Sequence, residues 1–129
     1  MIGGSRRIPS LGLTQYEHWK IPELREKVYA ILEQAIVESQ FEFDTVISGA
    51  CWGIDQLGEE WAKKNSKELI SKPADWDRYG KGAGFFRNGE MAKEGDMLIC
   101  VCTKDSRGSW SMMKLMNSLH KPVYVKYVQ

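Results

Sequence analysis

Six consecutive apolar residues, 97–102 (Met-Leu-Ile-Cys-Val-Cys), constrain the fold of this chain more than any other feature. A strand with one face in water alternates apolar and polar residues, whereas a strand covered on both faces reads as a continuous apolar run. Residues 97–102 therefore predict a central strand of a parallel sheet. Parallel neighbours need crossover connections, so helices are expected between the strands along the chain.

The rest of the sequence alternates between helical and strand-like patterns. Segments with apolar residues at helical spacing occupy residues 22–38, 53–62, 85–94 and the stretch after residues 106–109. Strand-like runs occupy residues 44–48, 68–72 and 122–128, after a very short first strand at residues 1–3. Residues 73–84 have no regular period, which predicts a long functional loop. This order predicts an α/β fold, a Rossmann-like three-layer parallel sheet with helices on both faces.

Length and charge limit the kinds of protein and partner. At 129 residues, with no linker-like change in composition, the chain is expected to form one domain, residues 1–129. Eighteen basic and seventeen acidic residues give a net charge of +1, so we expect no nucleic-acid or membrane partner and a local anion site at most. No segment approaches the roughly 20 apolar residues of a membrane span, and three cysteines fit reduced thiols. We expect a cytoplasmic protein, and the sequence leaves a homo-oligomer open.

Three glycine-rich segments follow predicted strands, so they should meet at the carboxyl edge of the sheet. Glycines in residues 48–53 let backbone N–H groups approach a phosphate, although tight strand–helix packing also explains them. Residues 106–109 add hydroxyls and a cation at another helix start, where simple capping by serine is the alternative. The residues expected to bind a ligand in these segments are Gly4, Ser5, Arg6, Ser48, Gly49, Ala50, Gly53, Ser106, Arg107, Gly108 and Ser109.

A second group of candidate residues lies in and around the long loop. Trp76 and Tyr79 can stack on a base, and Arg87 and Asn88 can hold a phosphate or a sugar edge, unless this segment is only a lid pinned by its aromatic residues. Asp55 either caps helix donors or accepts a hydrogen bond from a ribose hydroxyl. The expected ligand-binding residues of this group are Asp55, Asp75, Trp76, Tyr79, Gly84, Arg87 and Asn88. We expect no metal site, because no histidine or second cysteine pair stands at metal-ligand spacing around Cys100 and Cys102.

These segments together resemble a known family. The residues that carry the resemblance are Gly4-Ser5-Arg6, Ser48-Gly49-x-x-x-Gly53-Ile54-Asp55, Pro73-Ala74-Asp75-Trp76, Gly80-x-x-Ala83-Gly84-x-x-Arg87-Asn88-x-x-Met91, Asp96 and Ser106-Arg107-Gly108-Ser109. In their order and residue types, these segments resemble the SLOG superfamily, and within it the bacterial and phage YspA-type (YpsA-related) branch. They are more distantly similar to the Lonely Guy phosphoribohydrolases and to DprA. The match extends over nearly the whole chain except residues 7–43. It implies a Rossmann-like fold and a pocket for nucleotides or their derivatives, including ADP-ribose-like and NAD-derived molecules.

The same resemblance bears on catalysis. Lonely Guy enzymes cleave the N-glycosidic bond of a nucleoside monophosphate with an arginine and a glutamate; Arg87 stands at the position of that arginine, but Met112 stands at that of the glutamate. A thioether cannot handle a proton, so hydrolysis would need Asp55, Asp75 or Glu90 instead. The leading hypothesis is a module that binds a nucleotide or nucleotide-derived ligand of the ADP-ribose or NAD-derivative type and needs no cofactor. The alternatives are a hydrolase that cleaves an N-glycosidic or phosphate bond of such a ligand, and a phage or bacterial sensor or sponge for a nucleotide signal.

Overall fold

The computed structural model describes residues 1–128, in which short strands alternate with helices. The strands are β1 (Ile2–Gly4), β2 (Thr45–Ser48), β3 (Glu68–Ser71), β4 (Leu98–Cys102) and β5 (Val123–Tyr127). The α-helices are α1 (Pro22–Ser39), α2 (Ile54–Lys64), α3 (Trp76–Tyr79), α4 (Ala83–Glu94) and α5 (Arg107–Ser118). Short 3-10 segments are η1 (Pro9–Leu11), η2 (Tyr16–Lys20) and η3 (Gly80–Gly82). The predicted mixed α/β architecture is confirmed.

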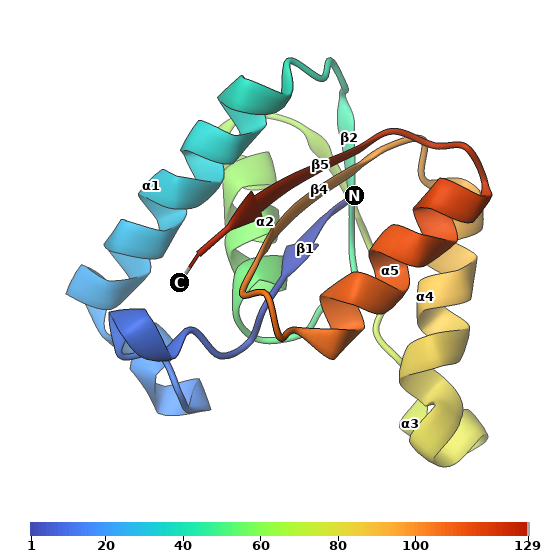
Figure 1. Ribbon diagram of the computed structural model, residues 1–129, viewed down its shortest axis with the longest axis horizontal. Coiled ribbons are helices and arrows are strands. Elements are labelled where there is room, and N and C mark those ends of the chain that lie inside the picture. The colour runs from blue at the N-terminus through green and yellow to red at the C-terminus, as the bar shows by residue number, and fades with distance from the viewer. Residues whose placement is uncertain (129) are drawn as a thin grey trace.

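The strands form two parallel sheets. One has the order β1-β4-β5 and the other pairs β2 with β3, while β1 and β2 contact each other where the two sheets meet (Figure 1). The central strand predicted at residues 97–102 is β4, which lies between β1 and β5. All five of its residues are buried, as the continuous apolar run requires.

Helices cover β4 on both of its faces. Helix α1 packs on β4 and β5 and contacts α2, whereas α5 packs on β1, β4 and β5 and contacts α4; Figure 1 shows α1 and α5 on opposite sides of the strands. The buried side chains divide in the same way: Ile99 and Val101 join the apolar cluster with α1 and α2, and Leu98, Cys100 and Cys102 join the cluster with α4 and α5. Successive residues of a strand point to opposite faces, so these five residues serve both clusters.

The loop expected at residues 73–84 is partly helical. Asp75 caps α3, because its Oδ1 accepts a hydrogen bond from the backbone N–H of Arg78 at 3.1 Å. The Tyr79 ring then stacks on Phe86 of α4, with ring centroids 4.1 Å apart. The prediction of an irregular loop was wrong for residues 76–84, which form α3, η3 and the start of α4. The short helix α3 is stabilised by a cap and one aromatic stack, which leave no periodic pattern in the sequence.

The first strand is as short as expected and lies one residue later than predicted. Its last residue, Gly4, lies so close to β4 that a Cβ atom there would be 1.8 Å from the carbonyl oxygen of Val101. The following segment, residues 5–20, is held by the buried side chains of Ile8, Leu13 and Trp19. The indole N–H of Trp19 donates to the carbonyl oxygen of Arg6 at 2.9 Å. This anchoring gives β1 and the residues after it a fixed place beside β2 and β4.

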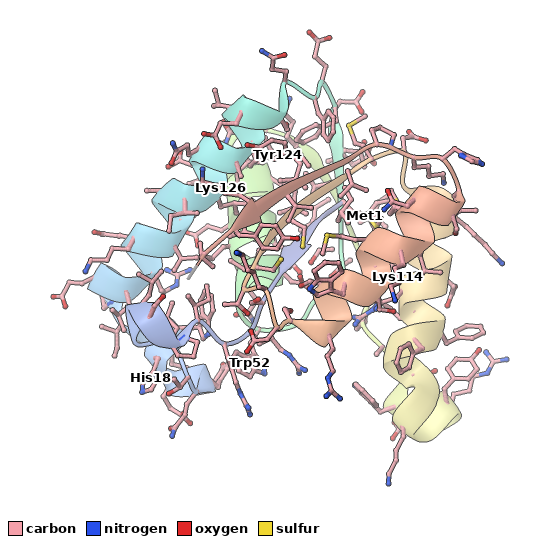
Figure 2. The ribbon with its side chains drawn as sticks, in the orientation of Figure 1. Met1, His18, Trp52, Lys114, Tyr124 and Lys126 are labelled. Atoms are coloured by element: carbon pink, nitrogen blue, oxygen red, sulfur yellow. The ribbon has the colours of Figure 1, made fainter. Side chains whose placement is uncertain are left out.

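Polar contacts connect α1 to the last strand. Both the hydroxyl of Tyr124, at 2.9 Å, and the ammonium group of Lys126, at 2.8 Å, donate to Oε1 of Glu38, and Figure 2 shows both side chains beside α1. These hydrogen bonds lower the pKa of Glu38, and the bond from Lys126 has the larger effect.

Among residues 1–128, no helix combines the length and apolar character needed to cross a bilayer.

Candidate functional site

A cavity of about 870 Å³ opens at the carboxyl ends of β1, β2 and β4. Its wall is formed by β1 and part of β4, by the residues that follow β1, β2 and β4, and by residues of α3, α4 and the N-terminal half of α5. A second cavity, of about 90 Å³, lies at the other end of the strands around Met1, Val46 and Gly95. Only the larger of these two has the size of a site for a small molecule, for which several hundred Å³ is typical.

Most of the residues predicted to bind a ligand line this larger cavity. They are Gly4, Ser5, Arg6, Gly49, Asp55, Trp76, Gly84, Arg87, Asn88, Ser106, Arg107, Gly108 and Ser109. They come from segments as far apart as β1 and α5, and the parallel topology brings them together as expected. The cavity is therefore the candidate functional site.

Five predicted residues lie outside the wall and have structural roles. Ser48 is buried, and its Oγ donates to Oε2 of Glu59 at 2.7 Å and accepts from the N–H of Ala50 at 3.1 Å. Ala50 and Gly53 adopt positive φ angles, 59° and 98°, which shape the turn into α2. The remaining two are Asp75, which caps α3, and Tyr79, which stacks on Phe86.

Arg87 and Asp55 approach Gly49 closely. Nη1 of Arg87 donates to the carbonyl oxygen of Gly49, and Nε donates to Oδ1 of Asn88 at 2.9 Å. A Cβ atom at Gly49 would lie 2.8 Å from Nη1 of Arg87 and 2.9 Å from Oδ2 of Asp55. The absence of a side chain at position 49 leaves room for the guanidinium group and the carboxyl group to reach this loop in their present positions.

Asp55 is the partly buried carboxyl group of the cavity. Its Oδ2 accepts from the backbone N–H of Cys51 at 3.3 Å, so it bonds back to the glycine loop instead of capping its own helix. Burial raises the pKa of Asp55 to about 6, although the Cys51 N–H and the nearby charge of Arg87 both lower it. An aspartic acid with this pKa can give or take a proton near neutral pH.

The first turn of α5 provides the second polar wall. Ser106 is the N-cap residue, but its Oγ donates to Oγ of Ser109 at 2.9 Å and forms no cap hydrogen bond. The first backbone N–H groups of a helix have no partners within the helix, and they carry its positive partial charge. Arg107 and Gly108 are both exposed here, and nothing lies within 4 Å of the position that a Cβ atom would take at Gly108.

Two neighbouring loops are joined at the cavity floor. The backbone N–H of Thr103, just after β4, donates to Oγ of Ser5, just after β1, at 2.9 Å. The Thr103 hydroxyl donates to Oδ1 of Asp105 at 2.6 Å, and the indole N–H of Trp110 donates to the carbonyl oxygen of Lys104 at 2.7 Å. These bonds fix the loop that precedes α5 relative to β1.

The cavity wall is basic although the chain is almost neutral. Its positively charged residues are Arg6, Arg7, Lys81, Arg87 and Arg107, and its acidic residues are Asp55 and Asp105. Five cations against two carboxyl groups concentrate positive charge at this edge of the sheet. The arrangement favours an anionic ligand.

The carboxyl groups that could replace the expected glutamate are not equally placed. Met112 lines the cavity as a buried thioether. Asp75 and Glu90 are exposed and lie outside the wall. Of the three substitutes considered from the sequence, Asp55 alone lines the cavity.

All three cysteines are free thiols. Cys100 and Cys102 are buried neighbours on β4, and contact with Cys102 together with burial raises the pKa of Cys100. Cys51 is partly exposed in the cavity wall, with its Sγ 3.8 Å from Nη2 of Arg87. Within residues 1–128, no three metal-ligating side chains gather as a candidate metal site.

Sequence reasoning did not assign several lining residues to the site. They include Arg7, Cys51, Trp52, Lys81, Phe85, Thr103 and Asp105. Cys51 and Trp52 lie within the predicted glycine loop, so their positions alone could have identified them. Phe85 had no such signal, because an aromatic residue at a helix start is also compatible with a core position.

Comparison of the chain with protein-family models, with curated proteins and with solved structures gives no match.

Proposed function

We propose that this chain is a three-layer, Rossmann-like domain of the SLOG type that binds a nucleotide or nucleotide-derived ligand in the 870 Å³ cavity. The position of the cavity carries the proposal. β1 contacts β2 on one side and pairs with β4 on the other. The chain therefore adds β2 and β3 on one side of β1, and then adds β4 and β5 on the opposite side. In open α/β sheets, ligands bind outside the carboxyl ends of the strands at such a switch point.

The phosphate end of the ligand lies at the first turn of α5. Backbone N–H groups at a helix N-terminus bind phosphate well, and Gly108 lets the ligand approach the backbone. Arg107 and Arg6, which both line the cavity, supply positive charge. Ser109 and Ser5 line it as well, with hydroxyl groups that can donate to phosphate oxygens.

Calorimetric titration with AMP and ADP-ribose tests this proposal. Arg107→Ala should weaken binding about tenfold or more, because a charge-assisted hydrogen bond to phosphate is lost. Lys114→Ala is the matched control, because Lys114 is an exposed cation on the same helix outside the cavity (Figure 2). Absence of binding at millimolar ligand, or equal effects of the two substitutions, would contradict the proposal.

A second candidate is a hydrolase for the N-glycosidic bond of the same ligand. It is favoured by Asp55, because burial in the cavity wall raises its pKa to about 6 and so keeps part of this carboxyl group protonated near neutral pH, as a general acid requires. Asp55 would protonate the leaving base as its bond to the anomeric carbon breaks, while water attacks that carbon. The proton that the water releases restores Asp55, and the products are a free base and a ribose phosphate. Chromatography of AMP incubated with the protein would detect both products. Asp55→Asn should abolish their formation while AMP still binds, and an inactive wild type would exclude this candidate.

A further inference from the structure

Two largely exposed aromatic rings stand in the cavity wall. Trp76 of α3 is 60% exposed and Phe85 of α4 is 72% exposed. The indole approaches α4 at Gly84, where a Cβ atom would be 3.8 Å from Cη2 of Trp76. Exposed apolar surface that lines a cavity is typical of ligand-binding grooves.

Other aromatic side chains near this wall are already engaged. Tyr79 stacks on Phe86, the guanidinium group of Arg78 lies 5.1 Å from its ring centroid, and neither ring lines the cavity. Stacking of a base on Tyr79, which the sequence suggested, would have to displace these contacts.

Trp52 lies on another part of the wall, in the loop after β2 (Figure 2). The guanidinium carbon of Arg6 lies 5.7 Å from the centroid of the Trp52 ring. The Tyr16 ring packs against Trp52 in a T-shaped arrangement, with ring centroids 6.0 Å apart. Trp52 is also half-buried and packs against the core. Trp76 and Phe85 therefore have the more accessible ring surfaces.

We propose that Trp76 and Phe85 form the base subsite of the cavity and hold the flat ring system of a nucleobase. This inference rests on the proposed function and narrows its substrate class to a phosphate ester that carries a base, as opposed to a sugar phosphate or inorganic phosphate. Helices α3 and α5 provide different parts of one cavity of about 870 Å³. A nucleotide with its phosphate at α5 and its base at α3 uses both of these parts.

The test compares AMP with ribose 5-phosphate, which has the same phosphate and sugar but no base. Calorimetry on the full chain should show tighter binding of AMP than of ribose 5-phosphate by the wild type. Trp76→Ala and Phe85→Ala should each weaken AMP binding about fivefold or more, as expected for loss of a stacked base, and leave ribose 5-phosphate binding unchanged. Trp76→Phe should keep most of the affinity for AMP that Trp76→Ala loses, because phenylalanine still provides a ring.

Tyr127→Ala is the matched control. Tyr127 of β5 is an aromatic residue that is 44% exposed and lies outside the cavity, so its substitution should leave AMP affinity unchanged. Phe85→Leu keeps an apolar side chain without a ring and should still weaken AMP binding. A Phe85→Ala variant that fails to fold would therefore not remove the test.

Three results would overturn the base subsite. Equal affinity of the wild type for AMP and ribose 5-phosphate would exclude a base subsite but would still support phosphate binding. Failure of the wild type to bind either compound would contradict both the base subsite and the proposed function. Unchanged AMP affinity in the Trp76→Ala/Phe85→Ala double variant would also exclude the base subsite. If that variant instead lost concentration-dependent self-association in sedimentation, the two rings would be a contact surface for a second copy of the chain.

Discussion

The guanidinium group of Arg87 is bonded to the backbone carbonyl of Gly49, across 38 residues of sequence. The bond connects α4 to the loop after β2, the loop that also contains Cys51 and bonds to Asp55. Arg87 therefore shapes the cavity from the α4 side in addition to supplying charge. An arginine whose only role was to contact a ligand would not affect the shape of the cavity in the ligand-free protein.

Arg87→Ala should lower the free energy of unfolding by about 1.5 to 3 kcal/mol, because a charged donor is removed from a partly buried carbonyl group. It should also weaken the binding of ADP-ribose, because the loop at Gly49 is no longer held. Urea denaturation and calorimetry measure the two effects.

Arg78→Ala is the control for this change, since Arg78 is an exposed arginine outside the cavity wall. It should have little effect on either measurement. A stable Arg87→Ala protein with normal affinity would show that Arg87 has neither role.

Asp55 should make the stability of the protein depend on pH. Its pKa is raised from 3.8 to about 6 in the folded state, so the folded protein binds this proton more tightly than the unfolded chain. The contribution of Asp55 to the free energy of unfolding is then greatest at pH values below its pKa in the unfolded chain. It falls as the pH rises from that pKa to the pKa in the folded protein, and it stays low at higher pH. Asp55→Asn removes this loss and should stabilise the protein near neutral pH by about 1 to 3 kcal/mol.

The measurement is the free energy of unfolding in urea at several pH values between about 4 and 7. Asp77→Asn serves as the control, because Asp77 is exposed and outside the cavity. A pH profile of the Asp55→Asn variant that parallels the wild type would contradict the prediction.

The features that could be read from the sequence are those with a periodic signal. Residues 97–102 predicted the buried strand β4, and residues 22–38 predicted α1, which ends only one residue later, at Ser39. Helix α3 was missed because its four residues are not buried, and its stability comes from contacts with Asp75 and Phe86 that leave no pattern. The 3-10 turns η1 and η2 likewise depend on tertiary packing of Ile8, Leu13 and Trp19.

The candidate site was predictable for a different reason. Parallel strands place all their carboxyl ends at one edge, so any residue directly after a strand, such as Arg6 or Ser106, could be assigned to that edge from its position alone. The orientation of each side chain could not be predicted in this way. Ser48 has the right position, but its hydroxyl bonds to Glu59 and Ala50.

Gly4 and Gly108 should respond in opposite ways to substitution by alanine. A Cβ atom at Gly4 would clash with the Val101 carbonyl oxygen at 1.8 Å, and this backbone cannot move without disturbing β4. Gly4→Ala should therefore cost about 3 kcal/mol or more, whereas Gly108→Ala fills open space in the first turn of α5 and should stabilise the protein by up to about 1 kcal/mol.

Calorimetry separates packing from binding at these two positions. Gly108→Ala should bind ADP-ribose more weakly despite its greater stability, because the added methyl group keeps phosphate away from the helix N-terminus. Normal affinity in this variant would place the phosphate elsewhere in the cavity.

Cys51 should report on ligand binding through its reactivity. It is the partly exposed thiol of the three and lines the cavity, while Cys100 and Cys102 are buried. One thiol should therefore react quickly with an aromatic disulfide reagent in the folded protein, and Cys51→Ser should remove that fast reaction. Saturating ADP-ribose should slow it, because a ligand in the cavity limits access to Sγ beside Arg87. An unchanged rate with ADP-ribose shown by calorimetry to be bound would mean that the ligand occupies the α5 wall without covering the loop at Gly49.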